Sequence, residues 1–179
     1  MRGRLMADGS RQISPLEGFA PTTDTHRQFR DALGRFASGV TIVTAQTDTG
    51  FIGMTANSFT SLSMDPPLVL WSPAKASNRF QFFANATHFA IHVLGQDQEH
   101  IAMGFAKSGT AFDGLDVEIN AKGVPMLNDC LARFECETYQ IHDAGDHAIV
   151  VGCVQSAAVR EGEPLIFSQG RFRRFDKEA

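Results

Sequence analysis

The spacing of apolar residues changes near residue 40. Between Thr25 and Gly39, apolar side chains recur at helical intervals, whereas from Val40 onward short apolar runs alternate with polar positions. Thr25 and Gln28 form a capping-box pattern, and Gly39 stands where a helix would stop. This segment therefore predicts an amphipathic helix that packs against a sheet.

The remainder predicts mainly short strands, many of them β-branched or aromatic. The predicted strands are 40–45, 51–60, 68–71, 89–94, 131–141, 147–159, 164–167 and 171–175. A short helix carrying Phe80 and Phe83 could be capped by Ser77, a helix is predicted over 97–107, and residues 108–129 are predicted to be irregular. Turns at 47–50, 145–146 and 161–163 join successive strands directly. We therefore expect a mainly β protein, an antiparallel barrel with a few peripheral helices, and not a doubly wound sheet.

Composition narrows the class of protein. The chain has 179 residues, of which 43% are hydrophobic, and a formal net charge of -4. We expect a flexible N-terminal arm over 1–24 and one domain over 25–179. The acidic balance indicates no nucleic-acid partner. No apolar run approaches the roughly 20 residues of a membrane span and the N-terminus lacks a secretory signal, so we expect a cytoplasmic protein without membrane contact.

Standard motifs are absent from the sequence. No GxGxxG, phosphate-binding P-loop, nucleophile elbow or zinc-binding spacing occurs, and the six histidines show no metal-ligand spacing, so no metal site is predicted. The three cysteines, Cys130, Cys136 and Cys153, form no CxxC pair. They are interpreted as buried free thiols of a reducing compartment, with a reactive thiol as the alternative.

The segment most suggestive of a ligand site is 53–63, which is dense in small hydroxyl residues within an otherwise apolar region. Hydroxyl and backbone N–H groups on small residues can approach a polar aromatic ring closely and both donate and accept hydrogen bonds. A Ser/Thr-rich strand with one solvated face explains the composition equally well.

An ordered series of motifs gives a family resemblance. Its members are Phe29–Thr44, Gly53–Phe59, Ser61–Ser63, Pro66–Val69, Phe89–Leu94, Gly145–His147 and Pro164–Phe167. The series resembles the flavin reductase-like, FMN-binding family, whose members supply reduced flavin to two-component monooxygenases. The resemblance spans about residues 29–175 and implies a split β-barrel, a homodimer, and flavin bound near the subunit interface.

The resemblance also implies which residues bind the flavin. The isoalloxazine would lie against Met54, Thr55, Ala56, Asn57 and Ser58. The flavin phosphate would lie in a loop that contains Ser72, Lys75, Ala76, Ser77 and Asn78. A lysine and backbone N–H groups suit an anion, although an ordinary helix cap with a surface lysine would have the same sequence.

Other matching positions extend the predicted site. His147 would orient the nicotinamide or stabilise charge on the reduced flavin, although a structural hydrogen bond is the alternative. Phe105 and Lys107 would lie near the cofactor, with Lys107 adding charge beside the phosphates. Arg171 and Phe172 are the last residues of the predicted site. Phe172 stands where many relatives have a tyrosine, so any contact through that hydroxyl is lost.

The expected activity is hydride transfer from NADH or NADPH to FMN or FAD. The resemblance implies that the reduced flavin is supplied to a partner monooxygenase. In this chemistry the cofactor reacts and the protein supplies proximity and orientation, which fits the absence of a sharp catalytic motif. A flavin-binding carrier with little reductase activity is the alternative, and a purely structural barrel is a third possibility. The choice of flavin and of nicotinamide stays open.

Overall fold

The structure is a computed structural model, and residues 15–174 are described. The contacts divide the chain into two units, 1–33 and 34–179. Residues 1–14 of the predicted arm and Phe175 of the last predicted strand lie outside the described residues. Among residues 15–174, no helix is long and apolar enough to cross a membrane.

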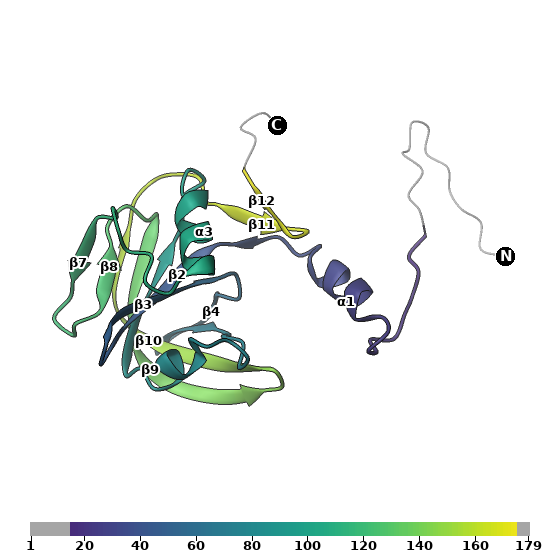
Figure 1. Cartoon of the computed structure of the whole chain (residues 1–179), viewed down its shortest axis with the longest axis horizontal. Coiled ribbons are helices and arrows are strands. Elements are labelled where there is room, and N and C mark those ends of the chain that lie inside the picture. The colour runs from purple at the N-terminus through teal and green to yellow at the C-terminus, as the bar shows by residue number, and fades with distance from the viewer. Residues whose placement is uncertain (1–14, 175–179) are drawn as a thin grey trace. The chain divides into compact units, whose positions relative to one another are not determined.

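The elements follow one another in an order dominated by strands (Figure 1). The helices are α1 (His26–Leu33), α2 (Phe80–Ala84) and α3 (Glu99–Lys107). The first strands are β1 (Ser38–Gly39), β2 (Thr41–Thr47), β3 (Gly50–Ala56), β4 (Thr60–Met64), β5 (Pro67–Trp71) and β6 (His88–Val93). The later strands are β7 (Val117–Ile119), β8 (Pro125–Leu127), β9 (Ala132–Ala144), β10 (His147–Val159), β11 (Ile166–Ser168) and β12 (Arg171–Arg173).

Seven antiparallel strands form the main sheet, in the order β3-β2-β6-β9-β10-β5-β4. The two edge strands, β3 and β4, are consecutive in the chain and are joined by residues 57–59, so the chain passes from one edge of the sheet to the other there. A three-stranded sheet, β1-β11-β12, and the β7–β8 hairpin accompany it. The predicted antiparallel, mainly β architecture is confirmed.

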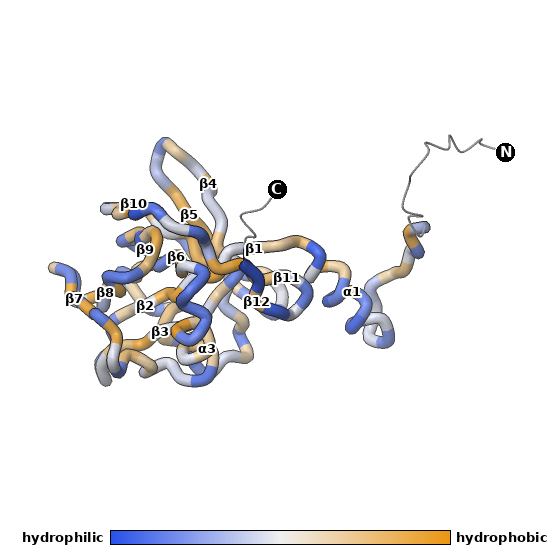
Figure 2. Tube along the Cα trace, turned by 90° about the horizontal axis from the view of Figure 1, so that it is seen from above, coloured by the Kyte–Doolittle hydropathy of each residue, from blue (hydrophilic) through white to orange (hydrophobic). Residues whose placement is uncertain are grey.

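Two clusters of buried side chains stabilise this arrangement. The larger contains Trp71 and Phe83, whose rings meet edge to face with centroids 5.1 Å apart. The second lies under α3 and includes Phe105 and Leu165, both fully buried. Figure 2 shows hydrophobic positions concentrated along strands such as β2 and β3, and hydrophilic positions in the connecting turns. Burial of apolar surface, at about 25 cal/mol per Å², is the main stabilising contribution.

Several predicted boundaries differ from the structure. The first helix ends at Leu33, and Gly39 belongs to β1, so the predicted helix stop at Gly39 is wrong. Thr25 Oγ1 donates to the carbonyl of Ala20 at 2.7 Å and the predicted capping box is not formed. None of the residues of α1 is buried. Helix packing on the sheet stays a prediction.

Two further corrections concern strands. The strand predicted over 51–60 ends at Ala56, because residues 57–59 leave β3 to reach β4. The segment 108–129, predicted to be irregular, contains the β7–β8 hairpin. All three cysteines are free thiols, with Cys130 and Cys136 buried and Cys153 half-buried, which agrees with the first interpretation.

Candidate active site

Three of the predicted segments are brought together by one side-chain hydrogen bond and one main-chain bridge. They are the connector 57–59, the loop 72–79 after β5, and the turn 145–147 between β9 and β10. Ser58 Oγ accepts the N–H of Ser72 at 2.9 Å, which joins the first two. Ala74 forms a β-bridge with His147, which joins the second and third. These residues are far apart in sequence, and strands β5 and β10 place them side by side because they pair with each other.

The outer edge of β3 carries backbone groups that bind something other than a strand at Gly53, through Gly109 and Arg79, and that are open at Thr55. The N–H of Gly53 donates to the carbonyl of Gly109 at 2.7 Å, so the backbone groups of Gly53 point away from β2. Backbone direction alternates along a strand, so the N–H and C=O of Thr55 point the same way. In the described part of the chain, no strand pairs with β3 on that side. This edge can therefore bind a ligand that presents both donors and acceptors.

The residues predicted to bind the flavin ring differ in which of their polar groups are accessible to a ligand. Met54 is 8% exposed and belongs to the larger core cluster, and Ala56 packs against the same cluster. The Thr55 hydroxyl donates to the carbonyl of Ala102 in α3 at 2.6 Å. Asn57 is exposed, and Ser58 is half-buried. The side chain of Asn57 and the main chain of Thr55 are therefore the groups best placed for a polar ligand. The Ser58 hydroxyl, which already bonds the main chain of Ser72 as both acceptor and donor, retains one acceptor position.

The loop after β5 has the character of an anion-binding segment. Ala76 and Asn78 are exposed. Within residues 15–174, their backbone N–H groups donate no hydrogen bond to protein. Ser77 Oγ accepts the N–H of Arg79 at 3.2 Å, and the N-cap of α2 is Arg79, so the predicted capping of that helix by Ser77 is wrong. Free N–H groups and a hydroxyl on small residues fit a phosphate.

Lys75 binds the neighbouring turn through both its main chain and its side chain. Its N–H donates to the carbonyl of Asp146 at 2.9 Å. Its Nζ donates to Asp143 Oδ2 at 2.5 Å and to the carbonyl of Gly145 at 2.6 Å. The hydrogen bond and charge of Lys75 lower the pKa of the Asp143 carboxyl below its ordinary value. The ammonium predicted to receive the flavin phosphate is thus already paired within the protein.

Arg79 is a site-forming residue that the sequence analysis missed. Its Nη1 donates to the carbonyls of Phe105, at 2.5 Å, and Gly53, at 3.2 Å, and its Nη2 donates to that of Ala106, at 3.0 Å. The guanidinium therefore ties the last turn of α3 to β3. Burial lowers the pKa of Arg79 from its ordinary value. No local pattern signals this role, because the carbonyls that Arg79 binds lie 26 and 27 residues away.

The prediction that Phe105 contacts the cofactor needs correction. Its ring is fully buried in the second core cluster. A Cβ at Gly53 would lie 2.4 Å from Phe105 Cε1, so the ring packs directly on the backbone of β3. Phe105 thus sets the spacing between α3 and β3 and is not available to stack on a ligand. Lys107 is exposed at the end of α3.

His147 begins β10, directly after the turn. Its Nδ1 lies 2.8 Å from Asp146 Oδ1, and 43% of its side chain is exposed. A carboxylate on Nδ1 orients the imidazole and favours a proton on that nitrogen, which leaves Nε2 as the atom able to meet a ligand. Asp146 therefore orients His147 as well as forming part of the turn.

The last predicted residues belong to a different sheet. Phe172 is half-buried, and its ring centroid lies 5.5 Å from that of Phe167. Arg171 is exposed and, together with Arg173, lies on β12. Among the hydrogen bonds of the described residues, none joins β12 to the three segments around His147. Phe172 packs against the core cluster that contains Phe105, and the part of Arg171 and Phe172 in the site stays a prediction.

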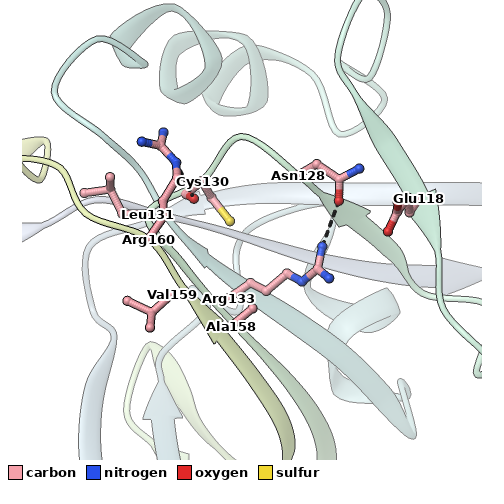
Figure 3. Close-up of a pocket in the computed structure, with 8 residues that line it drawn as sticks. All are labelled: Glu118, Asn128, Cys130, Leu131, Arg133, Ala158, Val159 and Arg160. Carbon is pink, nitrogen blue, oxygen red and sulfur yellow. Dashed lines mark hydrogen bonds between the residues drawn. The ribbon is translucent and has the colours of Figure 1, made fainter.

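A separate pocket lies at the opposite end of β9 and β10 from the turn at 145–147. Figure 3 shows Arg133 reaching toward Asn128, with Nη1 and Oδ1 2.8 Å apart. The cavity measures about 300 Å³ and includes Glu118 and Arg160 in its wall. None of the predicted site residues lines it, so it is distinct from the candidate active site.

Fold and site together define an antiparallel split barrel with an open edge at β3 and a loop of small residues beside it. Residues 33–176 match the family model described as a flavin reductase like domain. The chain belongs to the flavin reductase-like family.

Relatives of known name support the assignment. The chain is 58% identical over 160 residues to the FMN reductase (NADH) SmoA of Agrobacterium fabrum, covering 89% of this chain and 92% of the relative. It is 36% identical over 148 residues to the flavin-dependent monooxygenase reductase subunit HsaB of Rhodococcus jostii, covering 82% and 76%. Among solved structures, the NADH:FAD oxidoreductase SgcE6 of Streptomyces globisporus C-1027, in complex with NAD and FAD fragments, is 37% identical with a TM-score of 0.83, covering 90% and 99%. The predicted class of enzyme, a nicotinamide-dependent flavin reductase, is confirmed.

Proposed function

We propose that this chain transfers hydride from NADH to FMN. The open edge of β3 beside the loop 72–78 is the observation that carries the proposal, because together they offer donors and acceptors to a heteroaromatic ring and N–H groups to a phosphate. The choice of NADH and FMN rests on the name of the relative with 58% identity.

Each part of the proposed site has its own task. Thr55 main-chain groups, Asn57 and Ser58 would bind the polar edge of the isoalloxazine. The backbone N–H groups of Ala76 and Asn78, with the Ser77 hydroxyl, would hold the phosphate. Bound flavin supplies an electrophilic ring nitrogen that accepts the hydride, and the protein contributes proximity and orientation.

His147 would act on the nicotinamide side. Held by Asp146, its imidazole presents Nε2 as an acceptor or, when protonated, as a cationic donor. Either form can orient a carboxamide, and the cationic form can stabilise negative charge on reduced flavin. Lys107, Arg171 and Arg173 are exposed cations that would attract the phosphates of the dinucleotide.

Assembly and delivery of the product form the second part of the proposal. Large apolar side chains are exposed on strands of the main sheet, among them Met64 (92%), Tyr139 (58%) and Val159 (85%). A homodimer, which the family resemblance implies, could cover such side chains, but exposed apolar residues that do not form one patch do not by themselves require a partner. Reduced flavin would pass to a partner monooxygenase, as the name of HsaB indicates for that relative. Free thiols and the use of NADH support a cytoplasmic location.

The test is steady-state oxidation of NADH and NADPH by the purified chain, each measured with FMN, with FAD and without added flavin. The proposal predicts the highest kcat/KM for the pair NADH and FMN. Flavin binding without turnover in any combination would contradict reductase activity and support a carrier. Sedimentation velocity of the same sample tests the homodimer, which a single monomeric species would contradict.

A further inference from the structure

We propose that Asp143 is a positioning residue for hydride transfer, acting through Lys75 to hold the turn that carries His147 against the flavin-binding loop. The inference rests on the proposed function, in which His147 meets the nicotinamide. Asp143 lies outside every motif of the sequence, and neither it nor its pairing with Lys75 follows from the family resemblance.

The turn at 145–146 has few other attachments. It closes the long β9–β10 hairpin with Ala144 opposite His147, and Gly145 adopts a φ of 69°. The residues of β9 that lead to it, 139–143, are exposed. Attachment to the loop after β5 therefore determines where the end of this hairpin lies.

That attachment consists of two main-chain hydrogen bonds and one charged side-chain contact. The N–H of Ala148 donates to the carbonyl of Pro73 at 3.1 Å, and the N–H of Lys75 donates to that of Asp146 at 2.9 Å. The charged contact is the ion pair of Lys75 Nζ with Asp143 Oδ2 at 2.5 Å. Since Nζ also donates to the carbonyl of Gly145, one ammonium holds the strand end and the turn together.

The geometry separates two roles for Lys75. A lysine that served chiefly as a phosphate ligand would need no carboxylate partner within the protein, and Asp143 would have no part in the site. Instead Lys75 is anchored to the turn at three points, and its side chain is 33% exposed against 81% for Asp143. Asp143 therefore fixes the ammonium, the ammonium fixes the turn, and the turn fixes the imidazole of His147.

The experiment compares FMN with riboflavin, which has the same ring and no phosphate. For each variant, the KM of NADH, kcat and the flavin affinity are measured with both acceptors. The variants are Asp143→Asn, Lys75→Ala, Lys75→Arg and the double variant Asp143→Asn/Lys75→Ala. Glu137→Gln, an exposed carboxylate on the same strand, is the matched control. Asp143→Asn is also made in a His147→Ala background.

We expect Asp143→Asn and Lys75→Ala each to lower kcat/KM for NADH by about fivefold, the upper range for an exposed ion pair. The loss should be equal with FMN and riboflavin, and it should be no larger in the double variant than in either single variant. Lys75→Arg should recover part of kcat/KM, and Glu137→Gln should keep the wild-type value. In the His147→Ala background, Asp143→Asn should cause no further loss of kcat/KM. If Asp143 were merely structural, the loss would instead persist in that background.

Three results would overturn the inference. They are a loss confined to FMN, losses that multiply in the double variant, and an Asp143→Asn enzyme that matches the wild type. The first would make Lys75 a phosphate ligand independent of Asp143. A wild-type protein without turnover would instead refute the proposed function itself, so the two failures are distinguishable.

Discussion

Ser58 Oγ accepts the N–H of Ser72 at 2.9 Å, although the two residues are 14 positions apart. The contact joins the connector between the two edge strands of the main sheet to the start of the loop proposed to bind phosphate. A single hydroxyl thus sets the distance between the groups proposed for the flavin ring and those proposed for its phosphate.

Replacing Ser58 by alanine should weaken FMN binding. The substitution removes the hydroxyl proposed to bind the isoalloxazine together with its contact to Ser72, and loss of one hydrogen bond from the complex costs about 1 kcal/mol, or roughly fivefold in Kd. Quenching of flavin fluorescence on titration measures the effect. Ser61→Ala, at an exposed position of β4, is the control and should keep wild-type affinity. Equal affinity in Ser58→Ala and the wild type would refute the role assigned to this contact.

A methyl group at Gly53 should destabilise the protein. The added Cβ would lie 2.4 Å from Phe105 Cε1, and the buried ring has no open space into which to move. Overpacking of this kind costs about 1–3 kcal/mol, which urea denaturation of Gly53→Ala would reveal. Gly39→Ala is the control, because a Cβ there meets nothing within 4 Å. Adding Phe105→Leu to Gly53→Ala should recover part of the lost free energy of unfolding. A Gly53→Ala protein as stable as the wild type would contradict the packing described.

His92 should make the folded state sensitive to acid. It is fully buried, its Nδ1 lies 3.0 Å from the carbonyl of Ile42, and burial lowers its pKa from 6.5 to about 4. The unfolded chain therefore binds a proton at higher pH than the folded protein does. Stability from this residue is present above pH 6.5 and is lost as the pH falls toward 4, by roughly 3 kcal/mol.

The measurement is the free energy of unfolding at pH 6.5 and at pH 4 for the wild type and for His92→Gln. Glutamine keeps a polar side chain but does not titrate, so the difference between the two pH values should be smaller in the variant. The same pH dependence in both proteins would show that His92 does not cause the loss.

Substitution of His147 should separate nicotinamide use from flavin binding. His147→Ala is expected to lower kcat/KM for NADH by about tenfold, the effect of one hydrogen bond to a charged or strongly polar partner, while the Kd for FMN stays unchanged. Asp146→Asn should give a smaller effect in the same direction, because it weakens the contact that orients the imidazole. Wild-type kinetics with NADH in His147→Ala would remove the role proposed for this residue.

Local patterns predicted the fold well where strands are long or end at clear turns. The strand from His147 to Val159 was predicted with the bounds that the structure has, because it is largely apolar and follows a Gly-Asp turn. The β7–β8 hairpin was missed because strands of three residues are too short to show a period. Gly39 was misplaced because glycine ends helices but also occurs in a short strand such as β1.

The site was harder to predict because its contacts are long-range. The hydroxyl-rich segment stood out by composition, but its role and that of the turn before His147 were predicted only from the family resemblance. The Lys75–Asp143 pair spans 68 positions, and nothing near either residue indicates the other. The burial of Phe105 depends on a close approach to Gly53, which appears only once α3 is laid against β3.

Hydride transfer itself is tested most directly by mixing the protein and FMN with NADH under anaerobic conditions and following the absorbance of oxidised flavin. The account predicts that the absorbance disappears in one step with NADH, and more slowly when the transferred hydrogen of NADH is deuterium. Loss of absorbance only with an added chemical reductant, with no reaction on mixing with NADH, would contradict it and leave a protein that binds flavin without reducing it.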